Sequence, residues 1–427
     1  MGNTNVDDRP GRSGSDSFPD LSARSFWACT QRERDESFRI LRESTQLTFQ
    51  RPPEMSLLPA QQGYWAIVRH EDVRHVSRHP ELFCSGQGVV LDDAPAELYQ
   101  IVAGFLPADA PMHARLRGLV SRAFTPAQVK KIEGQIGDQA VRIVDEAVSA
   151  TDIEVVRQVS MRLPLWTISE MVGVPDEERV KMHEAANLLV AINDDEFVGA
   201  EDEPMTVLMG GVATLHEMAK TLAADRREHP ADDLMTALVH AEVDGESLTE
   251  NEIASFFTLL AVAGNDTTRN TITHAIKAFS DFPEQWELLK SDPGQYLDSA
   301  VEEMIRWASP VHLFRRTATE DTYIRDQLIH TGERVVMFYG SANRDEEVFE
   351  NPWTFDITRK PNEHLGFGGG GPHFCMGAFI ARRQLRAVFA EFAAKVERFE
   401  AGEVDLVTGN LIHNVRRLSC RLRVART

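Results

Sequence analysis

The sequence predicts one mainly α-helical domain with a small β region, spanning residues 26–427 and preceded by a polar tail at residues 1–25. Three observations predict this fold class. Apolar residues recur at intervals of three and four through most of the middle of the chain. Two-residue alternation is confined to short, widely separated segments. No linker rich in Pro, Gly and Ser divides the chain after residue 25, so the elements are expected to pack as one unit.

The first 25 residues are polar and open with the string MGNTNVDDRPGRSGSDS. This string lacks the apolar core of a signal peptide, and Val6 stands where a myristoylation signal requires Ser or Thr. We therefore expect a disordered tail at residues 1–25 and a cytoplasmic protein.

The middle of the chain is predicted to be a succession of helices. In residues 126–149, apolar residues recur at helical spacing at Val129, Ile132, Ile136, Ala140 and Ile143. The same pattern predicts helices at residues 160–173, 177–193, 206–227, 231–242, 249–280, 283–290, 295–307 and 376–398. Strand-like alternation is limited to residues 64–69, 322–329 and 334–339.

The composition narrows the function classes. The formal net charge of −21 disfavours a nucleic-acid partner and an anionic membrane surface. No run of about 18 apolar residues occurs, so no membrane anchor is expected. Cys29, Cys84, Cys375 and Cys420 are scattered without a CxxC pair, which suits neither a zinc finger nor a disulfide scaffold.

The string FGGGGPHFCMG at residues 367–377 places four consecutive glycines before Cys375. The alternatives are a flexible loop with a buried thiol, a phosphate-binding loop, a catalytic Cys–His pair and a thiolate metal ligand. No GK[ST] follows, and His373 lies only two positions from the sulfur, so the second and third are disfavoured. Cys375 directly precedes a predicted helix, whose free N–H groups favour a thiolate. Glycines would let the backbone approach a flat cofactor, so metal ligation fits the whole string.

This string resembles the haem-binding loop of the cytochrome P450 family, whose pattern is Phe-Gly-x-Gly-x-(His/Arg)-x-Cys-x-Gly. The matching residues are Gly369, Gly371, His373, Cys375 and Gly377. The family's Phe falls on Gly368, so the aromatic Phe367 is displaced by one residue. The resemblance covers residues 26–425 and implies the cytochrome P450 fold, with haem b (iron protoporphyrin IX) as cofactor and Cys375 as the iron ligand. The residues that it places around the haem in this loop are Phe367, Gly368, His373, Cys375 and Gly377.

A second resemblance lies in the helix predicted at residues 249–280. There the sequence AGNDTT matches the family's (Ala/Gly)-Gly-x-(Asp/Glu)-Thr-Thr motif. Polar residues could simply bend a buried helix. The resemblance instead implies that Ala263 and Gly264 lie against the haem, with Gly264 widening the helix to make room for O₂. It also implies that Asp266 and Thr267 are catalytic and manage the protons needed to cleave the O–O bond.

The resemblance also implies four groups that bind the haem propionates. His113 and Arg117 lie four residues apart on one predicted helix face, and Arg316 and His373 come from two other segments. For His113 and Arg117 the alternative is a basic helix face that offsets an acidic protein. Buried carboxylates must be paired, and donors from three distant segments suit that requirement.

A structural ion pair is implied at Glu303 and Arg306, which lie three residues apart on one helix face. In the family this pair is joined by an arginine from a Pro-Glu-Arg-Phe string. Here the string reads PWTF at residues 352–355 and lacks the arginine. We therefore expect Arg344 or Arg359 to complete the network.

The resemblance implies a monooxygenase that uses O₂ to hydroxylate an unactivated C–H bond of a small hydrophobic substrate. Electrons would come from a separate ferredoxin and ferredoxin reductase, and the protein is expected to be a monomer. Similarity is closest to actinobacterial enzymes that oxidise terminal methyl groups of sterols and methyl-branched lipids, and it also extends to terpene hydroxylases. The pocket positions that the family implies are Val89, Val90, Leu91, Phe105, Leu106, Leu259, Val262, Ala263, Val311, Leu313, Phe314, Leu411 and Ile412.

Arg382, Arg383 and Arg386 follow the cysteine and would form either a docking patch for an acidic ferredoxin or an ordinary solvated helix face. Two other functions are alternatives: a peroxide-dependent haem-thiolate enzyme and a non-enzymatic haem-thiolate sensor. The acid–alcohol pair Asp266–Thr267 disfavours the first, because peroxide-using enzymes usually lack it. No signalling or DNA-binding module is visible to support the second.

Overall fold

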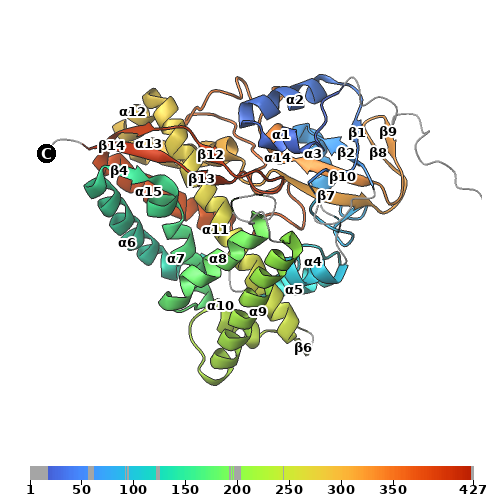
Figure 1. Cartoon of the computed structure of the whole chain (residues 1–427), viewed down its shortest axis with the longest axis horizontal. Coiled ribbons are helices and arrows are strands. Elements are labelled where there is room, and N and C mark those ends of the chain that lie inside the picture. Colours follow the sequence, from blue (N-terminus) through green and yellow to red (C-terminus); the bar gives the residue numbers. More distant parts are fainter. Residues whose placement is uncertain are drawn as a thin grey trace, which may run out of the picture.

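The structure is a computed structural model, and it describes residues 18–55, 62–91, 93, 96–121, 126–191, 194, 196, 203–243 and 245–424. Helices dominate and the strands form small sheets, as the sequence predicts. The long helix α11 runs through the middle of the molecule (Figure 1). A sheet-containing region lies at the upper right of that view, and other helices lie at the left and below.

The helices are bounded as follows: α1 Arg24–Ala28, α2 Gln31–Glu43, α3 His70–Arg78, α4 Ala96–Ala103, α5 Met112–Ser121, α6 Pro126–Ala150, α7 Arg162–Val172, α8 Arg179–Val190, α9 Pro204–Glu228, α10 Leu234–Val239, α11 Glu250–Asp281, α12 Pro283–Ser291, α13 Pro293–Ala308, α14 Tyr339–Ala342 and α15 Ala378–Lys395. A π-helical turn at Val156–Ser160 precedes α7, and a 3₁₀ turn at Asp176–Glu178 precedes α8.

The strands are β1 Thr48–Gln50, β2 Tyr64–Ile67, β3 Phe83–Cys84, β4 Asp152–Glu154, β5 Glu242–Val243, β6 Glu246–Ser247, β7 Leu313–Ala318, β8 Thr322–Ile324, β9 Gln327–Ile329, β10 Arg334–Phe338, β11 Val396–Ala401, β12 Asp405–Leu406, β13 Val415–Arg417 and β14 Ser419–Val424. The main sheet has the order β1-β2-β10-β7-β3, and β10 runs parallel to β2 while the other neighbours are antiparallel. A second sheet has the order β11-β14-β4.

Helix α11 begins with a capping box. The Thr249 hydroxyl accepts the N–H of Glu252 at 3.2 Å, and the Glu252 carboxylate accepts the N–H of Thr249 at 2.8 Å. Two backbone donors that a helix start leaves unpaired are therefore satisfied, which sets where the helix begins. The helix ends at Asp281, and Pro283 opens α12.

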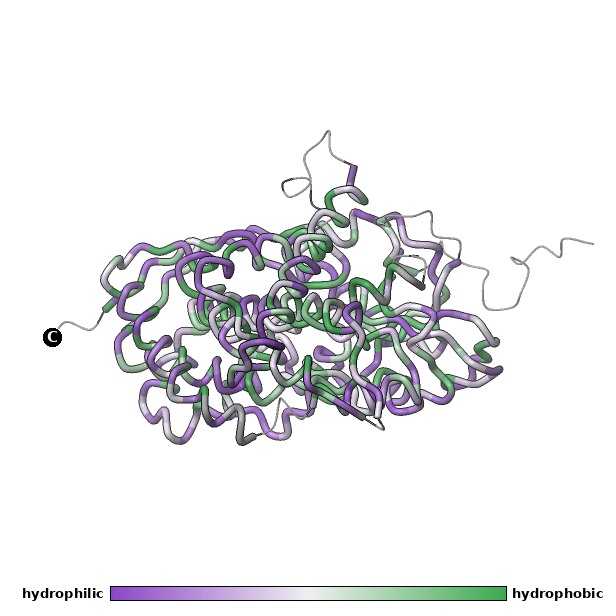
Figure 2. Tube along the Cα trace, turned by 90° about the horizontal axis from the view of Figure 1, so that it is seen from below, coloured by the Kyte–Doolittle hydropathy of each residue, from purple (hydrophilic) through white to green (hydrophobic). Residues whose placement is uncertain are grey.

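The hydrophobic core is divided along α11. Its first half, with Phe257 and Leu260, packs with α7, α9 and α10, whereas its second half, with Ile272 and Phe279, packs with α6, α13 and α15. Hydrophobic stretches are concentrated in the interior in Figure 2. The segment between the two halves contains partly accessible residues, and this is the segment that carries the AGNDTT motif.

Two predicted elements change identity in the structure. Residues 396–398, predicted as the end of a helix, begin β11, because Val396 and Phe399 are buried with two exposed residues between them. Residues 322–329 form the hairpin of β8 and β9 instead of one strand, because the chain turns at Arg325, whose φ is +52°.

The helix predicted at residues 231–242 is shorter than expected. It begins where Asp233 accepts the N–H of Thr236 at 2.8 Å, and it ends at Val239, before β5. The helix predicted at residues 160–173 begins at Arg162, since Ser160 closes the π-helical turn. The helices predicted at 126–149, 249–280 and 295–307 are confirmed as α6, α11 and α13.

The packed domain begins earlier than the predicted boundary at residue 26. Leu21 and Ser22 are 0% and 1% exposed, and the carbonyl of Leu21 accepts a hydrogen bond from the Trp27 indole at 3.1 Å. Residues 18–25 are therefore part of the domain, and the remaining predicted tail lies outside the described residues. No helix within the described ranges has the length and apolar character needed to cross a membrane.

Candidate active site

The glycine loop before α15 is fixed by its own backbone and by helix α3. Gly368, Gly370 and Gly371 have φ angles of +98°, +96° and +75°, which favour glycine. A Cβ atom on Gly369 would lie 2.5 Å from the hydroxyl of Ser77, and one on Gly371 would lie 2.2 Å from the Ser77 carbonyl oxygen. Close packing on α3 therefore requires glycine at these two positions, whereas the sequence predicted that a flat cofactor requires it. At Gly368 the space is open, with nothing within 4 Å of a Cβ atom.

Cys375 is exposed in the loop that leads into α15. Its backbone N–H donates to the carbonyl of Phe367 at 3.0 Å, which fixes the sulfur's position in the loop. The residue is exposed to solvent, yet the protein atoms packed around its sulfur desolvate the thiolate and raise the pKa of the thiol. The N–H groups of Gly377 and Ala378, at the start of α15, lower this pKa as predicted, as does Arg117, but burial outweighs them. An electron-accepting cation at the sulfur would therefore be needed to hold the thiolate.

Phe367 remains next to the cysteine despite its displacement by one residue. The Arg382 guanidinium lies 4.5 Å from the centre of its ring, and Arg382 is held by Glu302 at 2.6 and 2.8 Å. The ring of Phe374 lies 6.4 Å away. The cation–π contact and the ion pair anchor the ring from the α15 side.

Two histidine rings meet beside the glycine loop. The ring centres of His113 on α5 and His373 lie 4.1 Å apart, and Ser85 Oγ is 3.0 Å from Nε2 of His373. His113 Nε2 and His373 Nδ1 are buried without hydrogen-bond partners among the described residues. Burial, together with the nearby cations, lowers the pKa of His373 to about 2, so this ring is neutral.

Arg316 and Arg117 complete this group of donors. Arg316 on β7 is 5% exposed and donates to the carbonyl of Arg315 at 2.7 Å. Arg117 donates to the carbonyl of Phe374 at 2.6 Å. Within the described ranges neither guanidinium forms an ion pair, although the Asp109 carboxylate attracts Arg316 at longer range. Because buried cations and unpaired donors need acceptors, this group has the chemistry of a site for carboxylates, and two haem propionates would fit it.

Helix α11 carries small and polar side chains in the middle of its length. Ala263 is exposed and Thr267 is partly exposed, although both lie in the middle of a largely buried helix. The Thr267 hydroxyl donates to the carbonyl of Ala263 at 3.0 Å. A Cβ atom on Gly264 would lie 2.9 Å from Ile168 on α7, so glycine at this position allows α7 and α11 to pack closely. Its role in making room for O₂ stays a prediction.

Asp266 is fully buried at 0% exposure. Its Oδ1 atom lies 3.2 Å from Arg269 and 3.2 Å from the side-chain nitrogen of Asn265, and Oδ2 has no partner among the described residues. Burial raises the pKa of this carboxyl, while Arg269 and Asn265 lower it. The carboxyl can therefore hold a proton at a higher pH than an exposed aspartate.

The structural network around Glu303 is formed as predicted, and Arg359 completes it. Arg306 donates to both Glu303 oxygens at 2.7 Å, and both side chains are 0% exposed. Arg359 lies 3.2 Å from the same carboxylate. Arg344 instead lies 4.8 Å from the ring of Trp307, to whose carbonyl it donates at 2.7 Å. The network joins α13 to the segment that leads into the glycine loop.

The predicted pocket residues divide by exposure. Those that are partly exposed or exposed are Val90, Leu106, Leu259, Val262, Ala263, Val311, Phe314 and Leu411, and those that are buried are Val89, Leu91, Phe105, Leu313 and Ile412. Leu91 and Leu313, at 2% and 0% exposed, pack in the core beneath the N-terminal helices together with Phe338. These two belong to the hydrophobic core, and their contact with a substrate stays a prediction. Val311 pairs with Ile412 through a β-bridge, which joins two of the predicted pocket segments.

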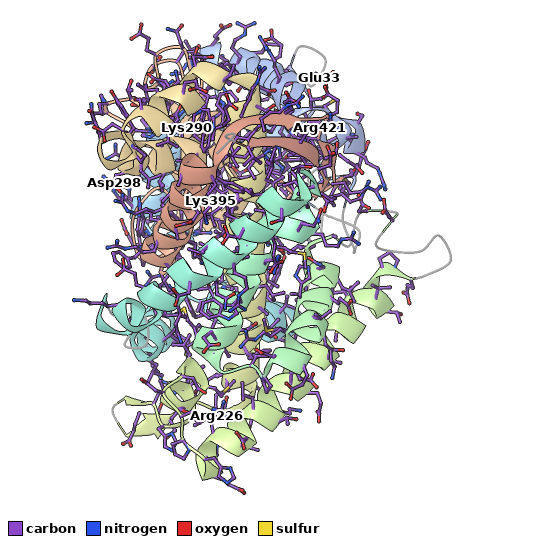
Figure 3. The ribbon with its side chains drawn as sticks, turned by 90° about the vertical axis from the view of Figure 1, so that its left-hand side faces the viewer. Glu33, Arg226, Lys290, Asp298, Lys395 and Arg421 are labelled. Carbon is purple, nitrogen blue, oxygen red and sulfur yellow. The ribbon has the colours of Figure 1, made fainter. Side chains whose placement is uncertain are left out.

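The three arginines after the cysteine are all engaged in ion pairs. Arg382 binds Glu302 at 2.6 Å, Arg383 binds Glu133 at 2.8 Å, and Arg386 binds Asp298. Asp298 lies at the edge of the molecule in the view of Figure 3. Carboxylates therefore offset the charges of these arginines, and their role in docking a ferredoxin stays a prediction.

A surface crevice of about 1210 Å³ lies beside β11, β14 and the end of α15. Lys290, Lys395 and Arg421, which line it, are labelled in Figure 3. None of the predicted site residues lines it, and Lys395 and Arg421 are paired with Asp145 and Asp152. This crevice is therefore not the active site.

Sequence reasoning missed the polar neighbours of the site. Ser85 contacts His373 across 288 positions of sequence, and His183 contacts Asn265 across 82. Neither residue belongs to a motif, so no local signal marks it. Arg269 is three residues from Asp266 on α11, and that spacing is the one signal that the sequence offered.

Comparison with known proteins agrees with this geometry. The family profile described as Cytochrome P450 matches residues 294–403. The Methyl-branched lipid omega-hydroxylase of Mycobacterium tuberculosis is 40% identical over 403 residues, covering 93% of each chain. The Steroid C26-monooxygenase of Rhodococcus jostii is 40% identical over 84% of this chain and 75% of that protein. The solved structure of Mycobacterium marinum cytochrome P450 CYP268A2 in complex with pseudoionone superposes with a TM-score of 0.91 at 46% identity, covering 94% of this chain and 98% of that one. By its loop, its fold and these relatives, the chain belongs to the cytochrome P450 family and is a haem-dependent monooxygenase.

Proposed function

We propose that this cytochrome P450 hydroxylates the methyl-branched end of a sterol or branched-chain lipid, with O₂ as oxidant and a ferredoxin and ferredoxin reductase as electron source. The relatives named as a methyl-branched lipid omega-hydroxylase and a steroid C26-monooxygenase support this substrate class. The overall reaction joins R–H, O₂, two electrons and two protons to give R–OH and water. Two protons must therefore reach the site in each turnover.

The observation that carries the chemistry is the exposed Cys375 thiol in the loop whose His373, together with His113, has a buried ring nitrogen without a hydrogen-bond partner among the described residues. Cys375 would ligate the iron of haem b, and the propionates would be held by His113, Arg117, Arg316 and His373. When bound, the haem supplies activation of O₂ at its iron, and a thiolate ligand favours O–O cleavage. The unpaired nitrogens of His113 and His373 support this fit, because each would gain an acceptor.

On the other side of the space, Asp266 and Thr267 would handle protons. The raised pKa of Asp266 favours its protonated form, so its carboxyl would serve as the buried proton store. The Thr267 hydroxyl now donates to the Ala263 carbonyl, and it would rotate to pass a proton into the space beside Ala263. The apolar residues Leu259, Val262 and Phe314 would exclude water and hold the lipid.

The electron-transfer partner would dock near the cysteine. Phe374 and Phe379 are 41% and 43% exposed there, and aromatic side chains are enriched at protein interfaces. An acidic ferredoxin would exchange places with the carboxylates that now bind Arg382 and Arg383. The cytoplasmic location and the monomeric state stay predictions.

A carbon monoxide spectrum tests the haem-thiolate assignment. The reduced, haem-loaded protein should show the red-shifted Soret band of thiolate-ligated haem, and Cys375→Ser should lose it while still folding. A matched variant, Cys420→Ser, changes a buried cysteine on β14, away from the proposed haem donors, and should keep the band. If Cys375→Ser kept the band, ligation of the iron by Cys375 would be contradicted.

Substrate binding tests the lipid class. A spin-state shift of the haem should follow addition of a sterol or a methyl-branched fatty acid, and a straight-chain fatty acid of equal length should bind more weakly. Pseudoionone, which the Mycobacterium marinum protein binds, serves as a further probe. Product formation with ferredoxin and reductase but not with hydrogen peroxide alone would support the monooxygenase over a peroxide-dependent enzyme, and absence of any product would favour a sensor.

A further inference from the structure

Five polar side chains form a closed ring between α8 and α11, joined by four hydrogen bonds and one ion pair. Asn265 Nδ2 lies 3.2 Å from Asp266 Oδ1 and 2.8 Å from His183 Nδ1. His183 Nε2 lies 3.0 Å from Asn187 Nδ2, and Asn187 Oδ1 lies 3.3 Å from Arg269 Nη1. Arg269 Nη2 closes the ring at 3.2 Å from Asp266 Oδ1. His183 and Asn187 belong to α8, so this ring links the buried acid on α11 to a second helix.

Four of the five side chains are buried and Asn187 is partly exposed, so each contact of the four buried side chains has to join a donor to an acceptor. Asp266, Asn265, Arg269 and His183 are 0%, 1%, 5% and 7% exposed. An unmatched polar pair at such depth costs about 1–3 kcal/mol. The positions of nitrogen and oxygen in asparagine amides, and of the proton on a histidine, follow from the hydrogen bonds that they make.

Donor and acceptor roles can be traced around the ring from Arg269, which can only donate. Because Arg269 donates to Asn187 Oδ1, the Asn187 amide nitrogen faces His183 Nε2, which must accept. A neutral His183 then carries its proton on Nδ1 and donates it toward Asn265.

Asn265 must therefore present its oxygen to His183. Turning the Asn265 amide exchanges the places of its nitrogen and oxygen, so Oδ1 gains the two partners and Nδ2 takes the place that has none among the described residues. The Asn265 oxygen then lies 3.2 Å from Asp266 Oδ1, in the place that the amide nitrogen occupies in the structure. Two acceptors at this distance repel each other unless Asp266 carries a proton and donates it.

We propose that His183 is a positioning residue for Asp266: through Asn265, its Nδ1–H tautomer holds the Asp266 carboxyl in the protonated form. This inference rests on the proposed proton role of Asp266. His183 and Asn187 on α8 would thereby keep the Asp266 carboxyl protonated between turnovers.

The electrostatics of the ring agree with this assignment. Burial lowers the pKa of His183 to about 4, so its imidazole is neutral near neutral pH and carries a single proton, as the tracing of donors and acceptors requires. Arg269 is the one charged group among the described residues that acts on both His183 and Asp266. It opposes protonation of Asp266, but it lies closer to Asn414 Oδ1, at 2.5 Å, than to Asp266, at 3.2 Å.

Infrared difference spectroscopy of the haem-loaded full chain tests the proposal. The wild-type minus Asp266→Asn difference at neutral pH should contain the C=O band of a protonated carboxylic acid. His183→Phe removes both ring nitrogens, so the Asn265 amide turns its nitrogen to Asp266 and the acid band should be replaced by carboxylate bands. Asn187→Ala frees His183 to carry its proton on Nε2, and the same replacement is expected.

The matched control is Thr258→Val, a buried substitution on α11 whose hydroxyl binds only the carbonyl of Ala254 in the described residues. It should keep the acid band. A wild-type difference spectrum with carboxylate bands only, or an acid band unchanged in both α8 variants, would overturn the proposal. Because the band is read without turnover, substrate or partner, this outcome is separate from failure of the proposed function, which the carbon monoxide and substrate spectra report.

Discussion

The Glu303 network allows a quantitative test of which arginine completes it. Glu303 is 0% exposed and is bound by Arg306 at 2.7 Å and by Arg359 at 3.2 Å. Breaking a buried ion pair by removing one partner costs about 3–5 kcal/mol. Arg306→Leu should fall in this range, because it also leaves the carbonyls of Asn343 and Pro352 without their donor. Arg359→Leu should cost less, about 2–3 kcal/mol, since its contacts to Glu303 are longer and Arg306 remains.

A double-mutant cycle isolates the pairwise energy. Glu303→Gln combined with Arg359→Leu should give a coupling free energy of about 1–2 kcal/mol, measured by urea unfolding of the haem-loaded protein. The control cycle uses Arg344→Leu, because Arg344 binds the carbonyls of Arg306 and Trp307 and not Glu303. Its coupling to Glu303 should be smaller than that of Arg359, because no hydrogen bond or ion pair joins the two and only a longer-range Coulombic attraction remains. A larger coupling for Arg344 than for Arg359 would refute the assignment of Arg359.

Three further predictions concern pH, the glycine loop and the pocket. Burial lowers the pKa of His274 to about 4, so this ring stays neutral in the fold while the unfolded chain takes up a proton below about pH 6.5. The contribution of His274 to stability is therefore fully present above that pH and is lost as the pH falls toward 4. His274→Phe should reduce the slope of the unfolding free energy against pH in this range by about 1.4 kcal/mol per pH unit. An unchanged slope would contradict this. Gly369→Ala should lower Tm and haem content, because its Cβ atom would lie 2.5 Å from the Ser77 hydroxyl. Gly340→Ala is the control and should change neither, because nothing lies within 4 Å of a Cβ atom there. Equal Tm values for the two variants would contradict the close packing of Gly369 on α3. Ala263→Leu should abolish the substrate-induced spin shift and leave Tm unchanged, because the residue is exposed to the interior space; a retained shift would remove Ala263 from the pocket.

Local spacing in the sequence determined the features that depend on neighbouring residues. The helix periods of residues 126–149 and 249–280, the string around Cys375 and the Glu303–Arg306 spacing each lie within one element or one loop, and the structure reproduces them. Helical side chains three or four residues apart share a face whatever the rest of the chain does. These features could therefore be predicted from the sequence alone.

The tertiary structure alone decided which distant residues meet. The choice of Arg359 over Arg344, the packing of Gly369 on α3 and the core positions of Leu91 and Leu313 each depend on contacts between segments far apart in the chain. Periodicity reports that a side chain is buried, and it does not report whether core atoms or an open space lie against it. For the same reason the sequence marked Asp266, while only the packing of α8 on α11 brought His183 and Asn187 into the ring that surrounds it.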